Sequence, residues 1–150
     1  MKKSLFSFIV VISFSGNSFA QVQKLQSVEE VHAQAEKAIE LIAMSEFTAA
    51  FEMLKKYWPQ PGYQVDGLKE TTAQQIPLLE DTFGSLKGYE FVNSKTLGTF
   101  GHVENFVLKY EKNALRIYLI YYNSGNGWAV NSLLWDDRWD YLFDDKAKAK

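Results

Sequence analysis

One stretch decides the fold: YEFVNSKTLGTFGHVENFVLKYEKNALRIYLIYYNSGNGWAVNSLL, residues Tyr89 to Leu134. It contains four runs that are rich in β-branched and aromatic residues and are separated by turn residues: Tyr89 to Leu97, His102 to Glu111, Ala114 to Tyr122 and Trp128 to Leu134. Asn126 and Gly127 form the strongest turn signal, because both tolerate the positive φ values of a tight hairpin. The stretch therefore predicts four antiparallel strands connected in order.

The residues before this stretch have the three- and four-residue periodicity of helices. Ser27 and Glu30 match a capping box, and the apolar face that follows predicts a helix over Val28 to Met44. Ser45 can cap a second helix, whose apolar side ends at Trp58 before two prolines. Both helices therefore have an apolar face to bury.

A loop and a third helical segment are expected between the second helix and the strands. Gln60 to Gly67 is typical of a loop, and apolar residues from Leu68 to Leu86 then return to helical spacing. Pro77 is expected either to start the main part of this helix or to kink it, because proline lacks an amide donor. Gly88 is expected to end this helix.

Helices followed by strands predict an α+β fold, with three helical segments packed on one face of a curved four-stranded antiparallel sheet. We expect a single domain over residues 21–145 and a flexible basic tail over residues 146–150, where Lys alternates with Ala. The composition, 47% hydrophobic and 15% aromatic, is sufficient for one core.

A family resemblance rests on Gly88 to Val92, Phe106 to Tyr110, Leu115 to Ile117 and the pair Gly127 and Trp128, together with the order of elements. In these features the chain resembles the nuclear transport factor 2-like, or cystatin-like, superfamily, and in particular small exported bacterial members without an assigned activity. The resemblance implies a cone-shaped domain whose sheet wraps a helix, often with a pocket at the open end and dimerisation through the sheet. Members include enzymes, ligand binders and interaction modules, so the fold does not select a function.

The first twenty residues predict a cleaved signal peptide. Lys2 and Lys3 give a positive start, Leu5 to Phe14 is an apolar run, and small residues end at Ala20. We therefore expect an exported protein, periplasmic or secreted, with no integral membrane anchor after cleavage. A retained anchor is the alternative, although the run is short for a membrane span, and the absence of cysteine excludes a lipidated precursor.

Charge and cysteine content exclude several classes of function. The chain has 16 basic and 18 acidic residues, and the only charged residues of the signal are basic, so the mature protein is mildly acidic. This balance argues against nucleic acid and anionic membranes as partners, because both favour concentrated Lys and Arg. With no cysteine, thiol chemistry, disulfides and thiolate metal sites are excluded.

Residues that bear reactive groups give no recognisable catalytic or metal site. An acidic cluster near the C-terminus, Asp136, Asp137, Asp140, Asp144 and Asp145, lacks the spacing of a calcium loop and fits a solvated face. His32 and His102 have no obvious ligand neighbours at helical or strand spacing. Hydrolase, zinc-protease and phosphate-loop motifs are also missing. We therefore expect no catalytic residue, no metal ligand and no cofactor.

Aromatic residues are the candidate ligand-binding residues. The set is Tyr57, Trp58, Tyr118, Tyr122 and Trp128. Alternation along the third strand places Tyr118 and Tyr122 on one side and Leu119 and Tyr121 on the other, so both faces of the sheet are partly apolar. The competing interpretation is that these rings fill the core.

The function favoured by the sequence is a non-enzymatic module that holds a small apolar ligand or a protein partner. The first alternative resembles the ketosteroid isomerase or dehydratase branches of the superfamily, which need an acid or His beside a Tyr donor. Asp66, Glu90 and Glu104 are the candidate acids, and none of them matches that site residue by residue. The second alternative is a structural domain that forms a homodimer through its sheet.

Overall fold

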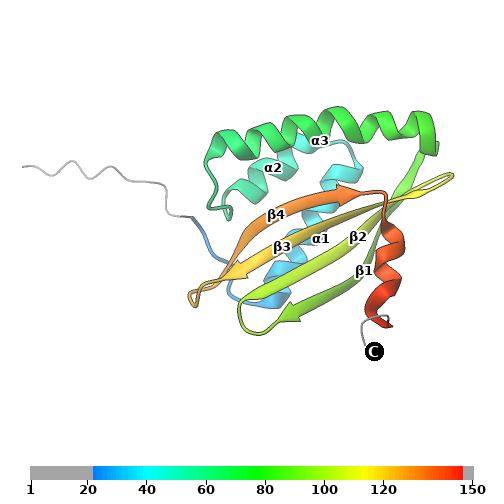
Figure 1. Ribbon diagram of the computed structural model, residues 1–150. Helices are drawn as coiled ribbons and strands as arrows, with labels where there is room; N and C mark the ends of the chain where they lie inside the picture. Colours follow the sequence, from blue (N-terminus) through cyan, green and yellow to red (C-terminus); the bar gives the residue numbers. More distant parts are fainter. Residues whose placement is uncertain (1–21, 147–150) are drawn as a thin grey trace, which may run out of the picture.

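The computed structural model describes residues 22–146 (Figure 1). The predicted signal peptide, and all but the first residue of the predicted basic tail, lie outside the described residues. Within the described range, no helix has the length and apolarity that a membrane crossing requires.

The described chain folds into three helices, a four-stranded sheet and a final 3-10 helix. In order they are α1 (Val28–Ala43), α2 (Phe47–Lys55), α3 (Gly62–Phe83), β1 (Leu86–Leu97), β2 (Gly101–Tyr110), β3 (Ala114–Asn123), β4 (Trp128–Asp136) and η1 (Trp139–Lys146). The strands lie in the order β1-β2-β3-β4, and each neighbouring pair is antiparallel. The sheet is curved and open, with β1 and β4 at its edges (Figure 1). The predicted α+β fold is therefore confirmed.

The third helix differs from the sequence prediction at both ends. It begins at Gly62 rather than after Gly67, because Pro61 lies at the N-cap, where the missing amide hydrogen costs nothing. Pro77 lies inside the helix and does not end it. The helix stops at Phe83 because Gly84 takes a φ of 79°, so the predicted continuation to Leu86 and the stop at Gly88 are wrong.

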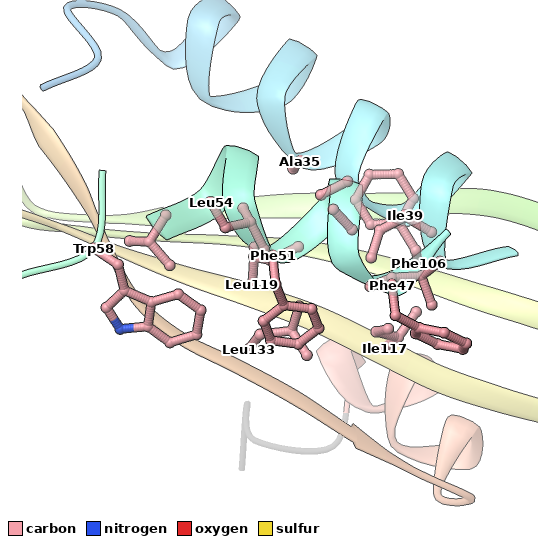
Figure 2. Close-up of a cluster of buried hydrophobic side chains, with 14 of the residues drawn as sticks. Ala35, Ile39, Phe47, Phe51, Leu54, Trp58, Phe106, Ile117, Leu119 and Leu133 are labelled. Atoms are coloured by element: carbon pink, nitrogen blue, oxygen red, sulfur yellow. The ribbon is translucent and has the colours of Figure 1, made fainter. Parts of the chain in front are cut away.

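The core lies between the helices and one face of the sheet, which we call the inner face. Ala35 and Ala38 of α1 are fully buried, and such small side chains allow a helix to approach a sheet closely. From α2, Phe51 and Leu54 pack over the sheet residues Leu119 and Leu133 (Figure 2). Side chains alternate along β2 and β3 between this core and the opposite, outer face.

The C-terminal η1 lies against part of the outer face. The indole Nε1 of Trp139 donates a hydrogen bond to Asn113 Oδ1 at 2.9 Å, and the Arg116 guanidinium lies 5.5 Å from the Tyr141 ring centroid. Arg116 also forms a two-hydrogen-bond pair with Asp136 of β4. Two aspartates of the predicted acidic cluster thus pair with arginines, Asp136 with Arg116 and Asp140 with Arg138. The side chains of Asp144 and Asp145 lie outside the described set.

Candidate functional site

The five aromatic residues predicted from the sequence lie in three separate places. Tyr57 and Trp58 follow α2 at one end of the core, and Trp128 is buried at the start of β4, with its ring 5.8 Å from the ring of His102. Tyr118 and Tyr122 project from the outer face of β3. The structure therefore does not bring the set together, and of the five only Trp58 lines the groove between α3 and β4.

A groove of about 320 Å³ lies between α3 and β4. It is lined by Trp58, Gln60, Gln64, Val65, Leu68, Asn131, Ser132, Leu133 and Leu134, and we call it the Trp58 groove. Its volume falls at the lower end of the range typical of small-ligand sites, about 300–1,000 Å³. Figure 1 shows that α3 runs alongside β4, the edge strand nearest to that helix.

The wall formed by α3 follows from the spacing of its residues. Gln64, Val65 and Leu68 lie within one helical turn on the side toward β4, and Thr72 continues that side one turn later. Thr72 is fully buried, and its Oγ1 accepts a hydrogen bond of 3.4 Å from the indole Nε1 of Trp135 on β4. This contact joins α3 to β4 one turn beyond Leu68.

The wall formed by β4 contains a bulge. Val130 pairs with Tyr121 and Ser132 pairs with Ile120, so Asn131 is an extra residue with no opposite partner on β3. A bulge bends its strand and changes the direction of neighbouring side chains. Here it places a polar pair, Asn131 and Ser132, at the groove, while Leu133 behind them is buried.

An ion pair fixes the helix that carries the other wall. Lys55, the last residue of α2, contacts both carboxylate oxygens of Asp66 at 3.0 Å. The hydrogen bond from Lys55 holds the pKa of Asp66 below its ordinary value. The Lys55 side chain also lies against Gly62, where a Cβ would be 3.1 Å from its Cε. The first turn of α3 is thus held against α2, next to the mouth of the groove.

The chemistry of the Trp58 groove is amphipathic and uncharged. Its lining combines apolar side chains with the amides of Gln60, Gln64 and Asn131, and contains no ionisable residue. Trp58 is 5% exposed, and its indole Nε1 is buried with no hydrogen-bond partner among the described residues. In Figure 2 this nitrogen lies on the edge of the indole that faces away from Phe51. Such lining suits a ligand with an apolar body and neutral hydrogen-bonding groups.

A second polar feature lies inside the core, where both histidines of the chain contact one carboxylate. Glu104 Oε2 is 2.9 Å from His32 Nδ1, and Glu104 Oε1 is 2.7 Å from His102 Nε2. The other ring nitrogen of His102 is 2.7 Å from Thr96 Oγ1. A neutral His102 satisfies all these groups if Nε2 donates to Glu104 and Nδ1 accepts from the Thr96 hydroxyl.

The burial of this network favours a structural role. Glu104 is 1% exposed and His102 is 3% exposed, so there is no room for a substrate against either side chain. Tyr121, next to them, has its pKa raised by burial and by the charge of Glu104. Of Glu104 and the two histidines, only His32 reaches solvent, with a side chain that is 39% exposed and an Nε2 that lies 4.0 Å from Glu36. The network therefore ties α1 to β2 and β1. Among the described residues, no group of three or more His, Cys, Asp or Glu is arranged to hold a metal ion.

The sequence reasoning did not find either feature. His32 and Glu104 are 72 residues apart, so their contact depends on how α1 crosses the sheet. A local signal did exist, because His102 and Glu104 lie two residues apart in a strand, which places their side chains on the same face. For the groove, the sequence predicts a loop at Gln60 and Gln64, whereas Gln64 forms part of the wall because α3 begins at Gly62.

Comparison with known proteins identifies no relative. The chain matches no protein-family model, no curated protein and no solved structure. The functional argument therefore rests on geometry and side-chain chemistry.

Proposed function

We propose that this protein is an exported, non-enzymatic binding protein and that the Trp58 groove holds its ligand. The observation that carries the proposal is the groove itself, which combines about 320 Å³ of space with an apolar floor and neutral amide groups. Export is inferred from the signal-like residues 1–20, whose pattern of charge and hydrophobicity is typical of secretory signals.

The ligand inferred from this lining is uncharged. Binding an ion in a groove without a compensating charge would cost much of its solvation free energy. An apolar group can instead lie over Trp58, Val65 and Leu68, while neutral donors and acceptors meet the amides of Gln60 and Gln64. The sequence predicted a small apolar ligand, and the groove adds neutral hydrogen-bonding groups to it.

A fragment screen by two-dimensional NMR tests this proposal. The ¹⁵N-labelled protein, residues 21–150, is titrated with a library of uncharged fragments that includes amides and dipeptides. We expect shift changes that concentrate on the groove residues, above all the indole signal of Trp58 and the amides of Ser132 and Leu133. A library that leaves every groove signal unmoved, or moves only signals elsewhere, would refute the proposal.

A pair of matched variants separates filling the groove from changing the helix. Gln64→Trp places a large side chain into the groove, whereas Gln75→Trp places the same side chain on an exposed position of α3 that does not line it. Both substitutions have similar helix propensities and similar changes of surface. Fragment binding should disappear in Gln64→Trp and persist in Gln75→Trp, with unfolding temperatures close to each other.

The outer face of the sheet supports a second candidate, a homodimer through the sheet. Exposed apolar side chains gather at the end of the sheet that carries the β1–β2 and β3–β4 turns: Leu97 is 63% exposed, and Phe100 and Tyr122 are each 49% exposed. A cavity of about 320 Å³, lined partly by Val103 and Ile120, lies on the same side. Such exposure in a small domain is typical of an interaction surface.

Light scattering after size-exclusion chromatography tests this candidate. If the outer face forms a dimer, wild-type protein has twice the chain mass and Tyr122→Glu elutes as a folded monomer, because a buried pair of carboxylates repels. A wild-type monomer across the micromolar range excludes the homodimer.

A catalytic function receives less support from the structure. Of the candidate acids, Asp66 is paired with Lys55, Glu90 with Lys109, and Glu104 is enclosed by the two histidines. An acid catalyst must contact its substrate. Asp66 and Glu90 are instead held by lysines, and Glu104 is covered by the core.

A further inference from the structure

The edge of β4 is only partly covered, and the uncovered part borders the Trp58 groove. At Trp128 the edge pairs with the segment before α1, through hydrogen bonds of 2.9 and 2.7 Å between the backbones of Leu25 and Trp128. At Val130 the backbone N–H donates to the carbonyl of Tyr57 at 2.9 Å. Beyond Val130, no other described segment makes a backbone hydrogen bond to this edge.

The strand register shows which backbone groups the open edge presents. The N–H of Val130 points away from β3, since it bonds to Tyr57, and Val130 is paired with Tyr121. Leu119 lies two residues from Tyr121 on β3 and is paired with Leu133, so Leu133 also turns its N–H and carbonyl away from β3. Leu133 follows Val130 by three residues, rather than by the usual two, because the bulge at Asn131 adds one residue to β4. The backbone of Leu133 therefore faces the groove without a strand partner.

The opposite wall leaves space for one extended chain. The groove has residues 131–134 of β4 on one side and Gln64, Val65 and Leu68 of α3 on the other, with a volume of about 320 Å³ between them. Residues 131–134 of β4 span about 13 Å at the usual rise of a strand, which matches about four residues of an extended peptide. Peptide recognition by strand addition uses this combination of an open strand edge and a facing wall that receives alternate side chains.

We propose that an extended, uncharged peptide segment of a partner protein adds to β4 as a fifth strand and fills the Trp58 groove. This inference rests on the proposed function and names the class of its ligand. The peptide backbone bonds to the N–H and carbonyl of Leu133, and alternate apolar side chains contact Val65 and Leu68. The neutral amides of Gln60 and Gln64 then meet the remaining peptide groups.

The structure itself indicates why the occupant is an extended chain. The same edge already accepts one extended segment, the residues around Leu25, as an antiparallel partner of Trp128. That segment passes through the N-cap Ser27 into α1, so it is not available to cover Leu133. A new strand would continue the pairing that Leu25 begins and would satisfy backbone groups that a smaller ligand leaves to water.

Selection from a library of random twelve-residue peptides displayed on phage tests the inference. The immobilised target is the chain over residues 21–150, and Gln64→Trp and Gln75→Trp serve as the filled and control targets. We expect the selected peptides to carry apolar residues at alternate positions, with few charges between them. They should bind the wild type and Gln75→Trp and lose at least about tenfold in affinity for Gln64→Trp, because the added indole takes their place.

N-methylation of a selected peptide then distinguishes strand addition from other modes. Each backbone N–H is methylated in turn, and the dissociation constant is measured by calorimetry. If the peptide forms a strand, methylation of the N–H that meets the Leu133 carbonyl weakens binding about tenfold or more, whereas methylation of the residue on either side, whose N–H points away from β4, changes it little. Losses spaced at three or four residues, or no losses, would overturn strand addition.

The outcomes separate this inference from the proposed function. If uncharged fragments bind the groove but no peptide is selected, the peptide inference fails and the proposed function stands. If peptides are selected that bind Gln64→Trp as well as the wild type, their site lies elsewhere, and the inference again fails. If neither fragments nor peptides reach the groove, both fail. Self-association through β4, seen as a dimer that Gln64→Trp dissociates, would replace the partner peptide by a second copy of the chain.

Discussion

Removal of the buried carboxylate of Glu104 should destabilise the protein far more than removal of an exposed one. In Glu104→Ala, the Nε2 of His102, only 2.7 Å from the lost oxygen, is left without its partner in a residue that is 3% exposed. His32 also loses the contact that ties α1 to β2. The substitution therefore combines an orphaned buried polar group with a small cavity.

The size of this effect follows from burial. A buried donor or acceptor left without a partner costs about 1–3 kcal/mol, and hydrogen bonds to a charged group lie in the upper part of that range. Because Glu104 bonds to the enclosed, neutral His102 and also to His32, we expect a loss of about 1.5–3 kcal/mol in the free energy of unfolding. Glu90 pairs only with Lys109 at the surface, and Glu90→Ala should cost less than about 1 kcal/mol.

Urea denaturation at pH 7, followed by tryptophan fluorescence, measures both variants. Glu104→Ala should lower the midpoint by at least about 1 M with an unchanged slope, and Glu90→Ala should change it little. Equal midpoints for the two variants would refute the assignment of Glu104 to a buried, fully bonded network. Partial recovery in Glu104→Gln, which keeps one acceptor and one donor, would support it further.

Three further predictions concern the core, a helix end and the C-terminal segment. Phe51→Ala removes a ring that is 1% exposed and should cost about 3–5 kcal/mol by urea denaturation, whereas a loss below about 1 kcal/mol would place this ring outside the core. Gly84→Ala should cost about 1 kcal/mol or more, because φ is 79° and the new Cβ would lie 2.8 Å from Glu111 Cβ; a neutral or stabilising effect would contradict that backbone conformation. Burial opposes ionisation of Asp136, but hydrogen bonds from Arg116 and Arg138 outweigh it and hold its pKa below the ordinary 3.8. The stabilisation is therefore complete above that pH and is lost as pH falls below it, so acid unfolding of Arg116→Met should begin with less stability and show a shallower pH dependence than wild type.

The fold could be predicted largely because its signals are local. The alternation of apolar side chains along β2 and β3 and the glycine-rich turn before Trp128 depend only on residues that are close in the sequence. The structure has antiparallel strands at these positions, as predicted. The sequence predicts a loop over Gln60 to Gly67 and so misses the start of α3, because proline ends one helix but is tolerated at the start of the next, where no amide donor is required. Local sequence signals therefore predict the helices and strands, but proline has opposite effects at the start of a helix and in its interior.

The candidate site depends on contacts that no local pattern contains. Trp58 was singled out by its residue type, but its groove is built from a helix and a strand about seventy residues apart in the chain. The open backbone of Leu133 follows from a bulge at Asn131 and from the carbonyl of Tyr57 that covers only Val130. Trp128 is as deeply buried as Trp58, at 6% against 5% exposed, but its ring lies beside His102 and does not line the groove. Position in the fold, rather than residue type or burial, separates these tryptophans.

Residue-specific hydrogen exchange tests the central claim, that the edge of β4 beside the Trp58 groove is an open binding site. In the free protein, the amide of Val130 should be protected by its bond to Tyr57, and the amide of Leu133 should exchange much faster. Addition of a selected peptide should slow exchange at Leu133 and leave Val130 unchanged. Equal protection of both amides in the free protein, or no change at Leu133 in the complex, would contradict the account.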